Sequence, residues 1–92
     1  MLNLKDALIL AGILNKYINE QSMEKDAITF IAEIVDRIAP QEYLLCVKLL
    51  TGKSTEDIAG QMAIDTLTEF INGLKENQIL ALISFYKSLG FN

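Results

Sequence analysis

Apolar side chains recur at the spacing of an α-helix along most of this chain. The clearest stripe lies between positions 27 and 38, with Phe30 at its edge; it comprises Ala27, Ile28, Ile31, Ile34, Val35 and Ile38. Charged side chains occupy or border the other side of the same segment. No run of β-branched residues alternates between apolar and polar positions, which is the pattern of a strand. The sequence therefore predicts an all-α protein.

Residues that favour helix ends divide the first half of the chain into helices. Asn3 can cap a helix over residues 4–20, and Ser22 can cap a second helix that ends near Ile38. Pro40 is the only proline. A first helical turn tolerates proline and a helix interior does not, so Pro40 is expected to begin the third helix.

The second half of the chain contains a further set of boundary signals. Gly52 is expected to end the third helix, and Ser54 with Asp57 to start a short fourth helix. Asp65, or Thr66 with Glu69, can start a fifth helix that ends at Gly73. Asn77 and Gly90 are the expected limits of a last helix over residues 78–89. We therefore predict a compact bundle of five or six short helices. Apolar residues make up 51 % of the 92 positions, so residues 1–92 are expected to form one domain around one core.

The net charge argues against nucleic-acid and membrane partners. Lys and Arg number 8 against 12 Asp and Glu, which leaves a net charge of -4. Proteins that bind phosphates or anionic lipids gain affinity from positive charge, so we expect no nucleic-acid partner. The most apolar run, residues 7–14, is much shorter than the about 20 residues of a bilayer span, so we expect a cytoplasmic protein with no membrane partner.

The composition also excludes most catalytic and metal-binding mechanisms. Histidine is absent and Cys46 is the only cysteine, which removes His-containing dyads, Cys-rich zinc sites and disulfides. Cys46 lies in an apolar run and is expected to be a small buried side chain in a reducing cytosol. The candidate acid/base groups are Glu56 with Asp57, and Glu33 with Asp36 or Arg37. Such positions at helix starts and on polar faces are more typical of solvated surface, so we expect no enzyme, no catalytic residue, no metal and no cofactor.

Residues 58–68 resemble the beginning of a helix-turn-helix. An Ile-Ala pair starts the first helix of that motif, and a small residue precedes an apolar one in its turn. However, Glu69 stands where an apolar residue is usual, and no Arg or Lys precedes Lys75 in the recognition helix. Carboxylates there oppose contact with phosphates. A small helical transcriptional regulator with a degenerate helix-turn-helix around residues 55–75 is therefore the alternative function.

The first and last predicted helices carry more apolar surface than one neighbouring helix can cover. In each of them apolar side chains span more than half of the helix circumference. Both helices could lie at the centre of the core. Alternatively, part of this surface forms a patch that a second copy of the chain or another protein covers. The residues predicted to bind a partner in that patch are Ile9, Ile13, Phe30, Leu80 and Phe85.

Helix caps and apolar positions in the C-terminal half to two thirds of the chain follow a spacing known from one protein family. The segments concerned are Ala39–Glu42, Leu49–Gly52, Ser54–Ile58, Gly73–Ile79 and Leu82–Gly90. Together they resemble the small tail assembly chaperones of long-tailed phages and prophages of low-GC Gram-positive bacteria. The resemblance includes no catalytic signature.

The resemblance implies a small helical protein of the host cytoplasm that is absent from the finished virion. Its implied partners are other copies of itself and the apolar, mostly helical tape measure protein, which it would coat during tail assembly. Some members of the family also occur as a longer, frameshifted form. A chaperone of an amphipathic helical client needs exposed apolar surface together with enough net charge to stay soluble, and this composition suits both requirements.

Overall fold

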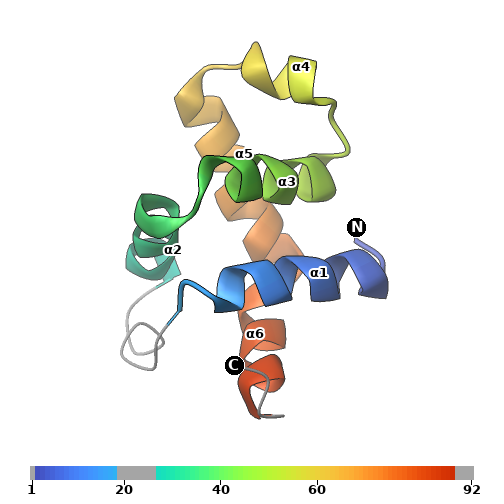
Figure 1. The fold of residues 1–92 in the computed structure, drawn as a ribbon, viewed down its shortest axis with the longest axis vertical. Helices are drawn as coiled ribbons and strands as arrows, with labels where there is room; N and C mark the ends of the chain where they lie inside the picture. The colour runs from blue at the N-terminus through green and yellow to red at the C-terminus, as the bar shows by residue number, and fades with distance from the viewer. Residues whose placement is uncertain (1, 19–26, 89–92) are drawn as a thin grey trace.

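Six α-helices occur in the part of the chain that this computed structural model describes, residues 2–18 and 27–88 (Figure 1). They are α1 (Leu4–Asn15), α2 (Ala27–Arg37), α3 (Pro40–Thr51), α4 (Thr55–Ala59), α5 (Ala63–Glu76) and α6 (Ile79–Ser88). No strand occurs within these two ranges. The prediction of an all-α bundle of five or six helices is confirmed. The predicted boundaries at Ser22 and Gly90 lie outside the described residues.

α5 and α6 follow one another along the long axis of the molecule, and α1 and α3 lie across them (Figure 1). α1 packs mainly against α6, and α3 packs mainly against α5. α4 lies at the end of the molecule opposite α6, beside the start of α5 (Figure 1). The described helices include none that is long and apolar enough to cross a membrane.

The core forms where the apolar faces of these helices meet. Phe70 of α5 is fully buried, and its ring meets the ring of Tyr43 on α3 edge to face, with the centroids 5.2 Å apart. Such a pair stabilises the contact between two helices beyond the area it buries. The buried apolar residues are Leu10, Ala11, Leu14, Ile18, Phe30, Ile31, Ile34, Ile38, Cys46, Val47, Ile58, Phe70, Leu74, Ile79 and Ile83.

Four predicted helix boundaries are confirmed, and all of them depend on local chemistry. The side chains of Asn3 and Ser54 each accept a hydrogen bond from the backbone N–H three residues later, at 2.8 and 3.2 Å. These bonds satisfy donors that the first turn of a helix leaves free. Pro40 is the first residue of α3, and Gly52 ends that helix in the left-handed conformation with φ of 73°.

The first helix is shorter than predicted. It ends at Asn15 rather than near residue 20, and Lys16 and Tyr17 form a turn. The ammonium group of Lys16 and the hydroxyl group of Tyr17 both donate hydrogen bonds to the carboxylate of Glu42 on α3. These contacts with a distant helix stabilise the turn, and the local apolar pattern did not indicate them.

The fifth helix begins earlier than predicted. Ala63 is its first residue, after Met62, whose side chain makes no capping hydrogen bond. Thr66, one of the predicted starts, lies inside the helix and accepts a hydrogen bond from Gln61 Nε2 at 3.0 Å. The Thr66 side chain therefore binds Gln61 in the preceding turn and does not cap the helix.

Gly73 and Asn77 act differently from their predicted roles at helix ends. Gly73 lies inside α5, where a Cβ atom would stand 3.1 to 3.2 Å from side-chain atoms of Leu50 on α3. The missing side chain thus permits a close crossing of the two helices. Asn77 ends α5 instead of capping α6: its Nδ2 donates to the carbonyl oxygen of Gly73 at 2.8 Å, and its Oδ1 accepts from the N–H of Leu2 at 3.0 Å.

Candidate protein-binding surface

α1 and α6 carry four of the five residues predicted to bind a partner. Ile9 and Ile13 lie one turn apart on α1, and Leu80 and Phe85 lie on α6. The exposed fraction is 41 % for Ile9 and 58 % for Phe85. Ile13 and Leu80 are half-buried and pack against the core. Ile9 and Phe85 are therefore the members of the predicted set that solvent reaches most fully.

Phe30 lies elsewhere. It is only 3 % exposed and belongs to the core together with Ile31 and Ile34 of α2. The sequence placed it at the edge of the apolar stripe, where the pattern alone does not decide between core and surface. In this structure the packing of α2 covers that edge, so Phe30 is a core residue and not part of an exposed patch.

The structure adds exposed apolar residues that the predicted set did not include. Leu4 and Leu8 lie one turn apart on α1 and are exposed, with Lys5 between them in the sequence. Their spacing of four residues marks a shared helix face and could have identified them. Among the residues whose burial the structure describes, the other exposed large apolar side chains are those of Leu45 on α3 and of Met62 and Ile64 on or next to the start of α5.

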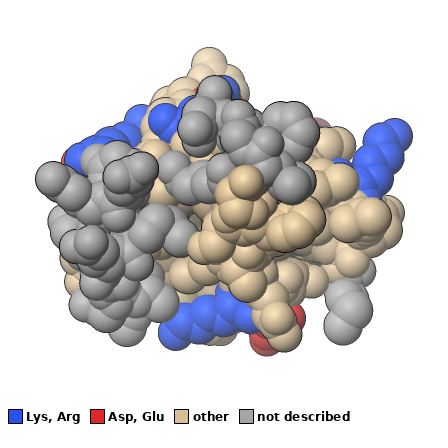
Figure 2. All heavy atoms as spheres, turned by 90° about the horizontal axis from the view of Figure 1, so that it is seen from below, with Lys and Arg blue, Asp and Glu red and all other residues tan. Residues whose placement is uncertain are grey.

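Part of the described surface at the end of the molecule that carries α6 is uncharged. In the view from below, uncharged atoms occupy the middle of the described surface, and Lys or Arg side chains stand toward its margins (Figure 2).

A second apolar feature is a pocket of about 400 Å³ among α2, α3, α4 and α5, here called the corner pocket. It is lined by Val35, Tyr43, Ile58, Gln61, Ala63, Thr66 and Leu67. Burial raises the pKa of Tyr43, so its phenol is neutral at physiological pH. Apolar walls with a few polar groups are typical of sites that hold an apolar side chain or small ligand.

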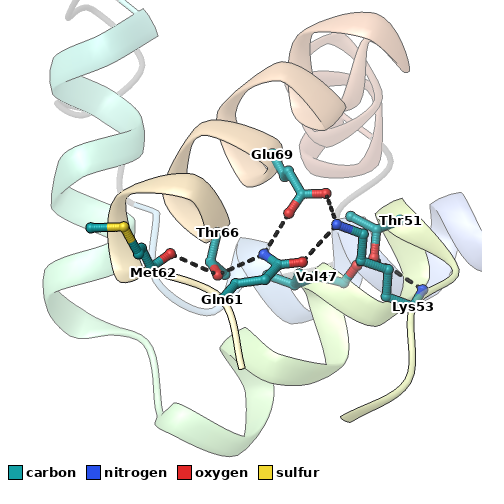
Figure 3. Close-up of polar contacts among 7 residues, drawn as sticks. All are labelled: Val47, Thr51, Lys53, Gln61, Met62, Thr66 and Glu69. Atoms are coloured by element: carbon teal, nitrogen blue, oxygen red, sulfur yellow. Dashed lines mark hydrogen bonds and ion pairs between the residues drawn. The ribbon is translucent and has the colours of Figure 1, made fainter. Parts of the chain in front are cut away.

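A polar network beside the corner pocket joins the loop after α3, the turn before α5 and α5 itself (Figure 3). Lys53 Nζ lies 2.8 Å from Glu69 Oε2 and donates a hydrogen bond to Gln61 Oε1 at 2.6 Å. Gln61 Nε2 donates to Glu69 Oε1 at 2.6 Å and to Thr66 Oγ1 at 3.0 Å. Because Gln61 and Thr66 also line the corner pocket, this network holds one of its walls in place.

We expect protonation of Glu69 to destabilise the fold. Hydrogen bonds from Lys53 and, second, from Gln61 lower the pKa of Glu69 below its ordinary value of 4.5. A carboxyl group with a lowered pKa in the folded state stabilises the protein above its unfolded pKa, and this contribution is lost as the pH falls through the lowered value. Glu69→Gln should therefore show a smaller drop in melting temperature than the wild type between about pH 7 and about pH 3.

The partner of Glu69 provides the matched variant for this measurement. Lys53→Met removes the ammonium group that lowers the pKa, so it should reduce the acid sensitivity in the same direction as Glu69→Gln. The two effects should not add in the double variant, because both substitutions remove one interaction. A melting temperature of Glu69→Gln with the pH dependence of the wild type would contradict the assignment.

A separate cluster, centred on Glu42, joins the end of α1 to α3. The hydrogen bond from Lys16, followed by that from Tyr17, lowers the pKa of Glu42. The same contacts with Glu42 raise the pKa of Lys16 and of Tyr17. At neutral pH the cluster therefore contains a carboxylate, an ammonium group and a neutral phenol, which suits a structural contact between two helices.

The structure places Cys46 in the core and Glu56 with Asp57 on the surface. Cys46 is completely buried, as predicted, and burial raises its pKa to about 12, so the thiol is protonated and a poor nucleophile at neutral pH. Glu56 and Asp57 are exposed in the first turn of α4. Residues 2–18 and 27–88 contain no group of three or more His, Cys, Asp or Glu residues that could hold a metal ion.

α4 and α5 form the helical corner on which the alternative function would depend. The exposed charge near the start of the second helix comes from Asp65, and Glu69 is paired with Lys53. A recognition helix approaches DNA phosphates with positive charge, whereas the Asp65 carboxylate is negatively charged.

A scan against protein-family models and searches of curated proteins and solved structures find no match to this chain. The features that bear on function are therefore the apolar surface of α1 and α6 and the corner pocket.

Proposed function

We propose that this protein is a non-enzymatic tail assembly chaperone of a phage or prophage. It self-associates and coats the apolar, helical tape measure protein in the host cytoplasm during tail assembly. The resemblance of its cap and apolar spacing to that family supports the proposal. The observation that carries it is the exposed apolar surface on α1 and α6, which includes Ile9 and Phe85.

Apolar exposure on α1 exceeds what scattered surface residues explain. Isolated exposed apolar residues are ordinary in proteins, but here Leu4, Leu8 and Ile9 lie on the same 12-residue helix. Burial of such side chains against a partner contributes roughly 25 cal/mol for each Å² removed from water. An amphipathic client helix can place anchors every three or four residues against such a surface.

The charge of the chain is compatible with this role. A net charge of -4 keeps a small domain soluble although part of its apolar surface is exposed. Copies of the protein can therefore accumulate before the client is made. Contacts that depend on apolar burial also require no positive charge on the surface.

The proposal predicts that this protein keeps the tape measure protein of the same tail gene cluster soluble. The two proteins would be co-expressed, and the soluble fraction of the tape measure protein would be measured with and without the chaperone. Size-exclusion chromatography with light scattering would then give the composition of the complex. The double variant Ile9→Ser with Phe85→Ser should lose most of the effect, because it removes exposed apolar contacts from both helices.

Leu45→Ser is the matched control. Leu45 on α3 is 42 % exposed, almost the same fraction as Ile9, but it lies on neither α1 nor α6. This control should solubilise the tape measure protein as well as the wild type does. A wild-type protein that neither binds nor solubilises the tape measure protein would overturn the proposed function, as would a double variant that is folded and fully active.

A further inference from the structure

We infer that the junction between α5 and α6 is a hinge, and that residues 63–88 also form one continuous helix in a second arrangement of the molecule. In the structure described above, this helix is broken at Asn77 and Gln78. In the second arrangement α6 carries α1 with it and moves relative to α3. The inference concerns movement within one chain, and it does not depend on whether the protein binds the tape measure protein.

Gln78 has a backbone conformation that is unfavourable for its residue type. Its φ is 51°, and within residues 2–18 and 27–88 it is the one residue other than glycine with a positive φ. Glycine occupies this left-handed region without strain, as Gly52 does at the end of α3, whereas a Cβ atom makes it unfavourable. The backbone of Gln78 is therefore relieved of strain when it takes the right-handed helical conformation.

The local sequence permits a continuous helix across the junction. The segment from Ala63 to Ser88 contains no proline, and its single glycine, Gly73, lies inside α5. The N–H of Asn77 donates to the carbonyl oxygen of Gly73 at 3.1 Å, and the N–H of Leu82 donates to the carbonyl oxygen of Gln78 at 3.2 Å. Helical hydrogen bonding thus reaches the break from both sides, and α5 and α6 already follow one another along the long axis (Figure 1). The two arrangements therefore differ mainly in the backbone angles of Asn77 and Gln78.

The helices on the two sides of the junction form two pairs. α1 packs mainly against α6, and α3 packs mainly against α5. A change of backbone angles at Gln78 therefore turns one pair against the other and keeps the larger contacts within each pair. A pocket of about 260 Å³ lies at the junction, so side chains there have room to shift; it is lined by Leu2, Ala7, Glu76, Asn77 and Gln78.

Polar contacts at both ends of α1 stabilise the broken arrangement. Before the start of α1, the N–H of Leu2 donates a hydrogen bond of 3.0 Å to Asn77 Oδ1. After its end, Lys16 and Tyr17 bind the carboxylate of Glu42 on α3. These contacts oppose the strain at Gln78. A partner that binds α1 and α6 more tightly in one arrangement shifts the equilibrium by that difference in affinity.

Replacing Gln78 by glycine tests for the strain. The side chain of Gln78 is exposed, and glycine accepts the left-handed conformation, so Gln78→Gly should raise the melting temperature by about 4 °C. Gln41→Gly makes the same change at an exposed helical position of α3 and should lower the melting temperature. If both variants melt below the wild type, Gln78 is not strained and the inference fails.

Replacing Gln78 by isoleucine tests for the continuous helix, because a β-branched side chain is strongly disfavoured at positive φ. In nuclear magnetic resonance spectra of Gln78→Ile, the HN–Hα coupling and Cα shift at position 78 should become helical. The amide protons of Ile79, Leu80 and Ala81 should exchange at least about 10-fold more slowly with solvent, because carbonyl groups one turn earlier then accept them. Nuclear Overhauser contacts between α1 and α6 should persist, whereas those between α1 and α3 should weaken.

Asn77→Ala tests the contact that stabilises the break. It removes the acceptor of the Leu2 N–H and leaves Gln78 unchanged, so the same signals should move in the same direction. Asn72→Ala makes this substitution at an exposed position within α5 and should leave those signals as in the wild type. Asn77→Ala also decides the matter if Gln78→Ile does not fold.

Three results would overturn the inference. One is a position 78 that stays left-handed in folded Gln78→Ile or in Asn77→Ala. Another is a loss of helical signals from residues 79–88, which would show local unfolding in place of a continuous helix. The third is a loss of the contacts between α1 and α6, which would show that these helices do not move as a pair. Failure to bind the tape measure protein affects none of these measurements.

Discussion

Phe70→Ala is expected to destabilise the protein by about 3 to 5 kcal/mol and to lower its melting temperature by roughly 15 °C or more. Phe70 on α5 is fully buried, and its ring packs edge to face against the ring of Tyr43 on α3, with the ring centroids 5.2 Å apart. Alanine would leave a cavity between two helices that cannot close without moving one of them. Chemical denaturation followed by circular dichroism measures the change in unfolding free energy.

Phe85→Ala is the matched control because it makes the same substitution at an exposed position. Phe85 is 58 % exposed on α6, so its truncation should change the unfolding free energy by less than about 1 kcal/mol. If the proposed function holds, the same variant should weaken self-association or client binding instead. Phe70→Leu, which retains more of the buried volume, should lie between the wild type and Phe70→Ala. Equal destabilisation by the two alanine variants would contradict the assignment of Phe70 to the core and Phe85 to the surface.

Gly73→Val is expected to destabilise the protein by about 1 to 3 kcal/mol through overpacking. A Cβ atom at this position would stand 3.2 Å from the Cβ atom of Leu50, and that atom can move only with the backbone of α3. The two methyl groups of valine would add to this crowding. The substitution should therefore force α3 and α5 apart, and thermal melts with chemical denaturation would measure the loss.

Gly60→Val is the control for the effect of valine replacing glycine. Gly60 follows α4 with φ of -83°, and a Cβ atom there would lie 3.6 Å or more from the nearest backbone oxygen atoms. This variant should differ from the wild type by less than about 0.5 kcal/mol. If Gly73→Val is as stable as Gly60→Val, the close crossing of α3 and α5 does not depend on glycine.

The packing of α1 against α6 leaves part of the apolar surface of both helices exposed. α1 packs mainly against α6, and Leu10, Leu14 and Ile83 of these helices are completely buried. The same two helices leave Leu4, Leu8, Ile9 and Phe85 exposed. An assembly protein uses such residues when a second copy or a client covers them, whereas a monomer gains no stability from their exposure.

Within the candidate site, sequence reasoning identified the two helices more reliably than the individual residues. The wide apolar arcs of the first and last helices indicated where uncovered surface would lie, and Ile9 and Phe85 are exposed there. Phe30 was placed in the same patch but is buried on α2. The polar network around Gln61 and the corner pocket had no signal in the sequence, because their residues come from four separate helices and the turns between them.

The sequence by itself determined the all-α class, the single core and the boundaries at Asn3, Pro40, Gly52 and Ser54. These features depend on interactions within a few residues: the period of apolar positions, a capping side chain, a missing N–H group, or a left-handed φ. Tertiary structure alone decided where α1 ends, how α5 passes through Gly73, and what Asn77 binds. The residues that contact these positions are Glu42, Leu50 and Leu2, and each lies far away in the sequence. Such contacts form only when the helices pack, and they then outweigh the local conformational preference of the segment.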